Sequence, residues 1–307
     1  MSNQNSNHYQ VQRFLLQTLD PVHVGTGGNR LGRVDLSIVR EPGTRLPKIP
    51  GTSLHGAIRQ YAAVCYGDLT TAGGGTNQDD SHPVNYTFGS IKESGGDSGQ
   101  SGRVSISDAR LLLFPVYSLV GPVWVTCPGI LSEFNVNEQE PFKLENGKKI
   151  ELVKLSSDLQ VHNHLNLGWL MLEKTSDDFN WPESINGVPK AITSRAVLVS
   201  DKLFSQIVNS NLEVRTSVRI DPETGAAADK ALFTYEAIPR ATILWLDVVE
   251  DDFSRKFPDH EKAKALGHKT PMDVVTAGLK LAEMLGIGGM GTRGFGRVRL
   301  LKGGSES

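Results

Sequence analysis

Residues 270–301 read "TPMDVVTAGLKLAEMLGIGGMGTRGFGRVRLL", and the order of the elements in this stretch decides the class of fold. Thr270 and Pro271 are typical of a helix N-terminus, apolar residues then recur at helical spacing, and Gly286 is typical of a helix C-terminus. In residues 295–301 arginines alternate with apolar residues, which predicts a strand. The stretch therefore predicts a helix, a glycine-rich turn and a strand, in that order.

The glycines of residues 289–294 match G-x-G-x-x-G, the pattern of dinucleotide-binding folds. That pattern holds a pyrophosphate only where the glycines leave a strand and open a helix, and here the order is reversed. The sequence therefore argues against a nucleotide- or cofactor-binding enzyme. Two interpretations of these glycines stay open: a tight turn between helix and strand, or a surface whose amides, beside Arg293, Arg297 and Arg299, contact phosphate.

The composition is that of an ordinary globular protein, with 38% hydrophobic and 21% charged residues. Two cysteines give neither a disulfide framework nor a zinc-binding spacing. No apolar run approaches the roughly 18 residues of a membrane span. The polar start "MSNQNSNHYQ" lacks the apolar core of a signal peptide, so we expect a cytoplasmic protein without membrane contact.

Positive charge is concentrated in the two glycine-rich regions of the chain. Residues 23–59 and 287–302 each carry a net charge of +4, so the rest must carry −10 to give the overall −2. Basic surfaces on an acidic body suit contacts with phosphates.

The order of predicted elements indicates an α+β fold with antiparallel hairpins. A helix is predicted within residues 46–66, with Thr52 or Ser53 as its N-cap. Strand patterns occupy residues 10–19, 103–118, 122–134 and 215–251. Residues 67–102 are rich in Gly, Ser and Asp and predict a mobile insertion, and residues 135–211 predict a mixed insertion that includes helix. No linker divides the chain, so residues 1–307 are expected to form a single domain.

Four ordered blocks of the sequence carry a resemblance to a known family. They are "HVGTG…GRVDLSIVRE…LPKIPGTSLHGAIR", "GRVSISDARLLLFPV", "RIDPETGAAADKALFTYEAIP" and "GGMGTRGFGRVRL". Together they resemble the RAMP superfamily of CRISPR proteins, and more closely the repeated backbone subunit of type III effector complexes of the Cmr (III-B) kind.

The resemblance implies a ferredoxin-like, RNA-recognition-type core with insertions and a thumb-like β-hairpin, for which residues 219–233 are the candidate. It implies a subunit that binds the CRISPR guide RNA and further copies of itself in a filament, beside other type III effector subunits. It also implies cleavage of complementary single-stranded target RNA by a metal-dependent endoribonuclease.

The resemblance places the catalytic aspartate at Asp35, which we expect to act as the ligand of a divalent metal ion such as Mg²⁺. His23 and Glu236 match further family positions near the site. Each has a plainer interpretation: Asp35 as a loop carboxylate paired with Arg33 or Arg40, His23 as a turn residue, and Glu236 as an ordinary strand residue.

RNA-binding candidates come from the basic loops and from the predicted N-terminus of the helix in residues 46–66. They are Arg33, Arg40, Lys48, Ser53, His55, Arg59, Gly289, Gly291, Thr292 and Arg293. Relatives commonly carry lysine where this chain has His55, so we expect a weaker or pH-dependent contact there.

Two functional alternatives remain open at this point. The chain could be a non-catalytic RNA-binding subunit of the same kind of complex, in which Asp35 only orders its loop. It could also be a metal-independent nuclease that processes precursor CRISPR RNA, with chemistry centred on His23.

Overall fold

A large mixed sheet forms the centre of the protein in the computed structural model, which describes residues 9–27, 34–73, 81–90, 99–220, 222–223, 225–251 and 256–301. Its eleven strands are β1 (Tyr9–Thr18), β4 (Val104–Ile106), β5 (Arg110–Val116), β6 (Val123–Thr126), β7 (Phe142–Glu145), β8 (Lys148–Ser156), β9 (His164–Leu167), β10 (Leu170–Phe179), β11 (Ala196–Leu198), β14 (Ile243–Asp251) and β15 (Val298–Leu301). The hydrogen-bonded order is β15-β1-β14-β5-β6-β11-β8-β10-β9, with β4 beside β14 and β7 beside β8.

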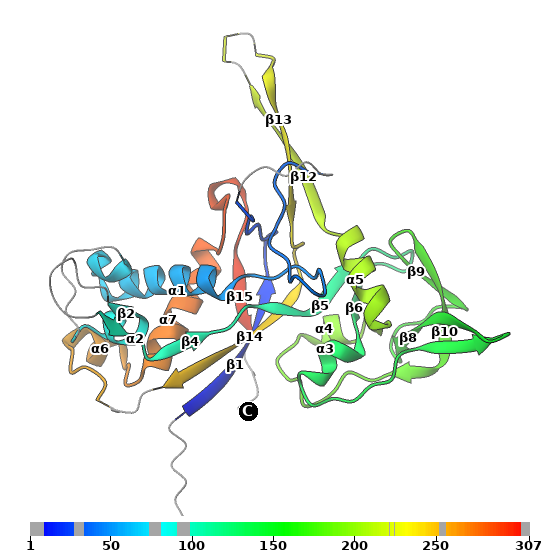
Figure 1. Ribbon diagram of the computed structural model, residues 1–307, viewed down its shortest axis with the longest axis horizontal. Coiled ribbons are helices and arrows are strands. Elements are labelled where there is room, and N and C mark those ends of the chain that lie inside the picture. The colour runs from blue at the N-terminus through cyan, green and yellow to red at the C-terminus, as the bar shows by residue number, and fades with distance from the viewer. Residues whose placement is uncertain are drawn as a thin grey trace, which may run out of the picture.

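Most neighbouring strands are antiparallel, as the sequence predicts, but β6–β11 and β8–β10 are parallel pairs. Figure 1 shows two groups of helices along the sheet. At one end lie α1 (Gly51–Tyr66), α2 (Pro83–Phe88), α6 (Glu261–Leu266) and α7 (Pro271–Leu285). At the other lie α3 (Pro128–Ser132), α4 (Lys190–Thr193) and α5 (Asp201–Ser210). The fold therefore combines helices with a large mixed sheet.

The sheet buries side chains on both faces. Along β1, Phe14 and Leu16 join the larger hydrophobic core with α1 and α7, whereas Leu15 joins a second core. Successive residues of a strand point to opposite faces, so this alternation requires cover on each side.

The ends of α7 are those that the sequence predicts. Thr270 caps the helix in a capping box with Asp273, and Gly286 follows its last turn. Gly278 lets α7 approach α1 closely, because a Cβ at this position would lie 2.4 Å from the Ile58 carbonyl oxygen.

The start of α1 corrects the sequence prediction. The helix begins at Gly51, after Pro50, and neither Thr52 nor Ser53 caps it. The Gly51 amide instead donates a hydrogen bond of 2.7 Å to the Asp108 carboxylate, which comes from the turn between β4 and β5. A distant carboxylate therefore replaces the local hydroxyl cap, and a local sequence pattern cannot show that.

A long β-hairpin projects from the body of the molecule, where residues 219–233 were expected to form one (Figure 1). It consists of β12 (Glu213–Ile220) and β13 (Ala227–Ala237), which are antiparallel. Residues 221 and 224 and the side chains of residues 219 and 227–231 lie outside the described part of the chain.

The described parts of residues 67–102 are a 3-10 turn (Leu69–Ala72), α2 and the short strands β2 (Gly89–Ser90) and β3 (Gln100–Ser101). All six residues of α2 are buried. Residues 74–80 and 91–98 lie outside the described residues. In the described ranges, no helix has both the length and the apolarity needed to cross a membrane.

The close approach at Gly278 leads to a stability prediction. Gly278→Ala should lower the free energy of unfolding by about 1–3 kcal/mol, because the clash with α1 outweighs the gain in helix propensity. Gly56→Ala on the exposed face of α1, where a Cβ would meet nothing within 4 Å, is the control and should be neutral or stabilising. Urea unfolding measures both, and equal effects would contradict the packing argument.

Candidate active site

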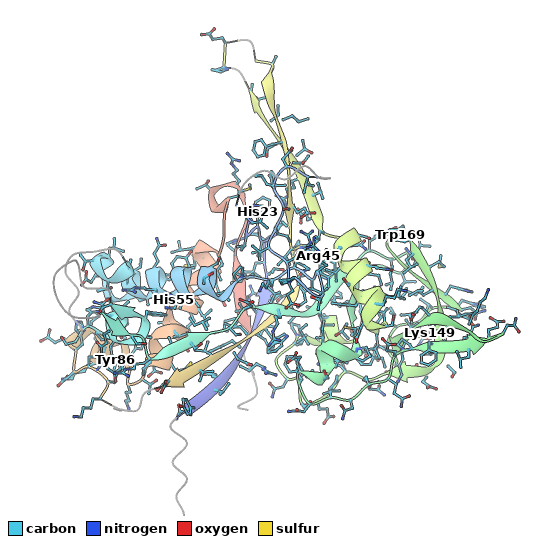
Figure 2. The ribbon with its side chains drawn as sticks, in the orientation of Figure 1. His23, Arg45, His55, Tyr86, Lys149 and Trp169 are labelled. Carbon is cyan, nitrogen blue, oxygen red and sulfur yellow. The ribbon has the colours of Figure 1, made fainter. Side chains whose placement is uncertain are left out.

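His23 lies at the base of the β12–β13 hairpin (Figure 2) and is buried, with 6% of its surface exposed. Its Nδ1 atom is 2.6 Å from the backbone carbonyl oxygen of Glu236 on β13. Because a carbonyl only accepts hydrogen bonds, Nδ1 carries the proton and Nε2 holds a lone pair in the neutral ring. The backbone carbonyl of His23 accepts the Gly289 amide at 2.8 Å.

Asp35 is exposed and lies beside Thr234, on the same edge of β13 that Val22 and His23 contact. Its Oδ2 atom accepts hydrogen bonds from the Thr234 amide at 2.7 Å and from the Thr234 hydroxyl at 2.9 Å. These bonds, the amide first, lower the pKa of Asp35, so the carboxylate is ionised at neutral pH. Oδ1 accepts no hydrogen bond from the described residues.

Glu236 is bound inside the site through one oxygen of its carboxylate. Oε2 pairs with the Arg40 guanidinium at 2.9 Å, and both side chains are mostly buried. The Arg40 Nε atom also donates to the Asn209 side chain at 2.9 Å. Arg40 therefore binds β13 rather than Asp35, so the ion pair that the sequence offered between Asp35 and Arg40 does not form.

An aromatic cluster connects the hairpin to the C-terminal glycine loop. Tyr235 contacts Phe295 at 5.4 Å between ring centroids and His23 at 6.2 Å. The Arg215 guanidinium lies over Phe295 at 4.7 Å. Gly288 contributes by its size and its φ of +91°, because a Cβ there would lie 2.5 Å from the His23 carbonyl oxygen. The glycine loop can therefore pack against the backbone of His23 only because position 288 has no side chain.

Three more of the predicted RNA-binding residues have internal partners. Lys48 pairs with Asp108. Arg59 donates to the Thr71 carbonyl at 2.8 Å and to the Asn85 side chain at 3.1 Å. His55 is half-buried against Phe88, and burial followed by the charge of Arg59 lowers its pKa, so it is neutral at pH 7.

The remaining RNA-binding candidates divide between the surface and the first turn of α1. Gly289, Gly291, Thr292 and Arg293 are exposed, and residues 291–293 form a 3-10 turn. Ser53 is half-buried in the first turn of α1 and donates its amide to the Pro50 carbonyl. Arg33 lies outside the described residues.

Thr234 is the site residue that sequence reasoning missed. It precedes Tyr235 and Glu236 in the same block, and strand alternation places Thr234 and Glu236 on one face of β13. That alternation was the available signal, because Glu236 was already a candidate.

The donor set around Asp35 suits a hydrated Mg²⁺ rather than a protein cage. The described residues contain no group of three or more His, Cys, Asp or Glu side chains arranged to hold a metal ion. Mg²⁺ keeps several waters and binds through one or two carboxylates, so the Oδ1 atom of Asp35 offers one suitable ligand.

Comparisons with known proteins agree on one family. The model of the RAMP superfamily matches residues 15–299. The CRISPR system Cmr endoribonuclease Cmr4 of Pyrococcus furiosus is 30% identical over 244 residues, 75% of this chain and 78% of that protein. The crystal structure of oligomeric Cmr4 from the same organism aligns with a TM-score of 0.61 at 22% identity, covering 95% of this chain and 98% of the other.

A chain of the cryo-EM structure of type III-B Cmr-beta bound to cognate target RNA aligns with a TM-score of 0.60 at 17% identity. The alignment covers 95% of this chain and 96% of that one. Both structural alignments show a shared fold.

The contact between Thr234 and Asp35 can be tested without any assay of function. Thr234→Val keeps the amide and removes the hydroxyl, so the pKa of Asp35 should rise, whereas Thr234→Ser should keep it low. Carboxyl-carbon NMR titration of the labelled chain measures this pKa. An unchanged value in Thr234→Val would show that the hydroxyl does not bind Asp35.

Proposed function

The chain belongs to the RAMP superfamily, and on this premise we propose that it is a guide-RNA-binding backbone subunit of a type III CRISPR effector complex that cleaves complementary target RNA. The observation that carries the proposal is the convergence of His23, Asp35 and Glu236 on β13 at the base of the projecting hairpin. The name of the Pyrococcus furiosus relative, an endoribonuclease, supports the same activity.

RNA is cleaved when a 2′-hydroxyl attacks the adjacent phosphorus and the 5′-oxygen leaves. His23 suits proton transfer in this reaction, because the bond from Nδ1 to Glu236 leaves Nε2 free to accept or return a proton. Asp35 brings a fixed negative charge held by Thr234. We assign Glu236 a positioning role, since its carbonyl orients His23 and its carboxylate holds Arg40.

A divalent cation, when bound, supplies charge stabilisation at the phosphate. Asp35 would hold it through Oδ1. Its carboxylate is ionised and anchored at Oδ2, so the free oxygen has a defined direction.

The same proposal extends to the partners and the core of the chain. Guide RNA would lie along the exposed glycine loop with Arg293, and the target strand would meet the hairpin. Further copies of the chain and other type III effector subunits would flank it in the cytoplasm, on a single RAMP domain with a ferredoxin-like core. The solved structures of oligomeric Cmr4 and of Cmr-beta with target RNA support these partners by similarity of fold.

The central prediction concerns Asp35. In a complex assembled on a defined guide RNA, Asp35→Asn should slow cleavage of labelled complementary RNA by about 100-fold or more and leave RNA binding intact. Asn retains an oxygen to accept the Thr234 amide, so the fold should persist. Gel analysis of the products measures the rate.

Metal removal separates the alternatives in the same assay. EDTA should abolish cleavage by the wild type, and Mg²⁺ should restore it. Cleavage that survives EDTA but requires His23 would support a processing nuclease. Binding without cleavage in the wild type would make the chain a scaffold.

A second prediction concerns the exposed arginine of the glycine loop. Arg293→Ala should weaken RNA binding about equally for all sequences and reduce the slope of log affinity against log salt by about 0.7. Lys202→Ala, an exposed cation on α5, is the matched control and should leave the slope unchanged. Equal slopes for wild type and Arg293→Ala would remove the loop from the RNA path.

A further inference from the structure

The free nitrogen of His23 faces a glycine at the protein surface. His23 itself is buried, whereas Gly25 is exposed and pairs with Ile38 as an extended residue. A Cβ on Gly25 would lie 3.1 Å from Nε2. Any side chain at position 25 would therefore cover this nitrogen.

The position that the glycine leaves open lies along the lone-pair direction of Nε2. The same Cβ would be 3.9 Å from Cε1 and 4.0 Å from Cδ2, the two carbons that flank Nε2. The longer distances to both carbons place it on the lone-pair side of Nε2, and their near equality places it close to the plane that bisects the ring angle at this atom. A distance of 3.1 Å also falls within the range of N···O hydrogen bonds.

The surrounding backbone holds this geometry in place. The Val39 amide donates to Val24 at 2.9 Å, and the Thr26 amide donates to Ser37 at 3.2 Å. Residues 24–26, which include Gly25, are thus hydrogen-bonded to residues 37–39, which follow Asp35 in the chain. The ring of His23 is held through Nδ1 by Glu236.

We infer that Gly25 keeps the lone-pair direction of His23 Nε2 open for one oxygen atom of bound RNA, either of a phosphate or of a 2′-hydroxyl. Both oxygens suit this nitrogen: a hydroxyl donates to neutral Nε2, and a phosphate oxygen accepts from its protonated form. The inference rests on the proposed function, because it takes RNA as the ligand. Gly25 therefore helps to position the substrate, in addition to its role in the backbone.

A double-mutant cycle in the assembled complex tests the inference. Gly25→Ala should slow target cleavage by about as much as His23→Ala, roughly 100-fold, and the double variant should be no slower than either single one. Gly43→Ala, where a Cβ would meet nothing within 4 Å, is the control and should cleave like the wild type. Additive losses, or a fully active Gly25→Ala complex, would overturn the inference.

A second measurement needs no cleavage. Exchange of the His23 Cε1 hydrogen for deuterium requires water to reach the ring, so mass spectrometry should find it several-fold slower in Gly25→Ala than in wild type or Gly43→Ala. Equal rates would overturn the inference even in an inactive complex. Failure of the wild type to cleave would count against the proposed function instead, so the two failures are distinguishable.

Binding of RNA that is chemically modified at the cleavage position identifies which RNA oxygen contacts His23 Nε2. If it is the 2′-hydroxyl, a single 2′-deoxy substitution should weaken binding to wild type but not to Gly25→Ala. If it is a phosphate oxygen, a methylphosphonate at that position should show this pattern. Equal losses in both proteins for both modifications would exclude an RNA oxygen at Nε2.

Discussion

The pairing of β13 with two extended segments at the base of the hairpin is the constraint on which the site depends. The Leu36 amide donates to Thr234, the Glu236 amide donates to Leu36, and Ile238 pairs with Val22 in both directions. In this register Thr234 meets Asp35, while the Glu236 carbonyl meets His23. A slip of one residue would place Tyr235 where Thr234 stands and separate both contacts. The backbone ladder therefore positions the acid and the imidazole together.

The basic residues of the two glycine-rich regions divide into two groups. Arg40, Lys48 and Arg59 are bound to carboxylate, carbonyl or amide oxygens and hold elements of the fold together. Arg293 is exposed, and its guanidinium lies 5.9 Å from the centroid of the Phe233 ring on β13. The carboxylates of Glu236 and Asp108 offset the charges of Arg40 and Lys48. Most of these cations therefore shape the proposed RNA-binding surface, whereas Arg293 is placed to contact RNA directly.

Sequence patterns predicted the elements that local physics determines. The start of α7 at Thr270 and the terminal strand follow from spacing and turn residues, whereas the family resemblance supplied the thumb-like hairpin. The patterns failed where a distant partner decides: Asp108 caps α1, and the internal partners of Arg40 and Arg59 come from residues far along the chain. The role of Thr234 depends on the register of β13, which requires three dimensions. The family resemblance supplied Asp35 and His23, which composition could not identify.

The most direct test of this account is the cryo-EM structure of the complex assembled with guide RNA and a target carrying a 2′-deoxy nucleotide at the cleavage position. Such a target lacks the attacking hydroxyl and stays intact. We predict that its phosphate lies beside the Asp35 carboxylate, with RNA also in contact with His23 at the base of the hairpin. A target strand that crosses another face of the protein, away from both side chains, would contradict the account.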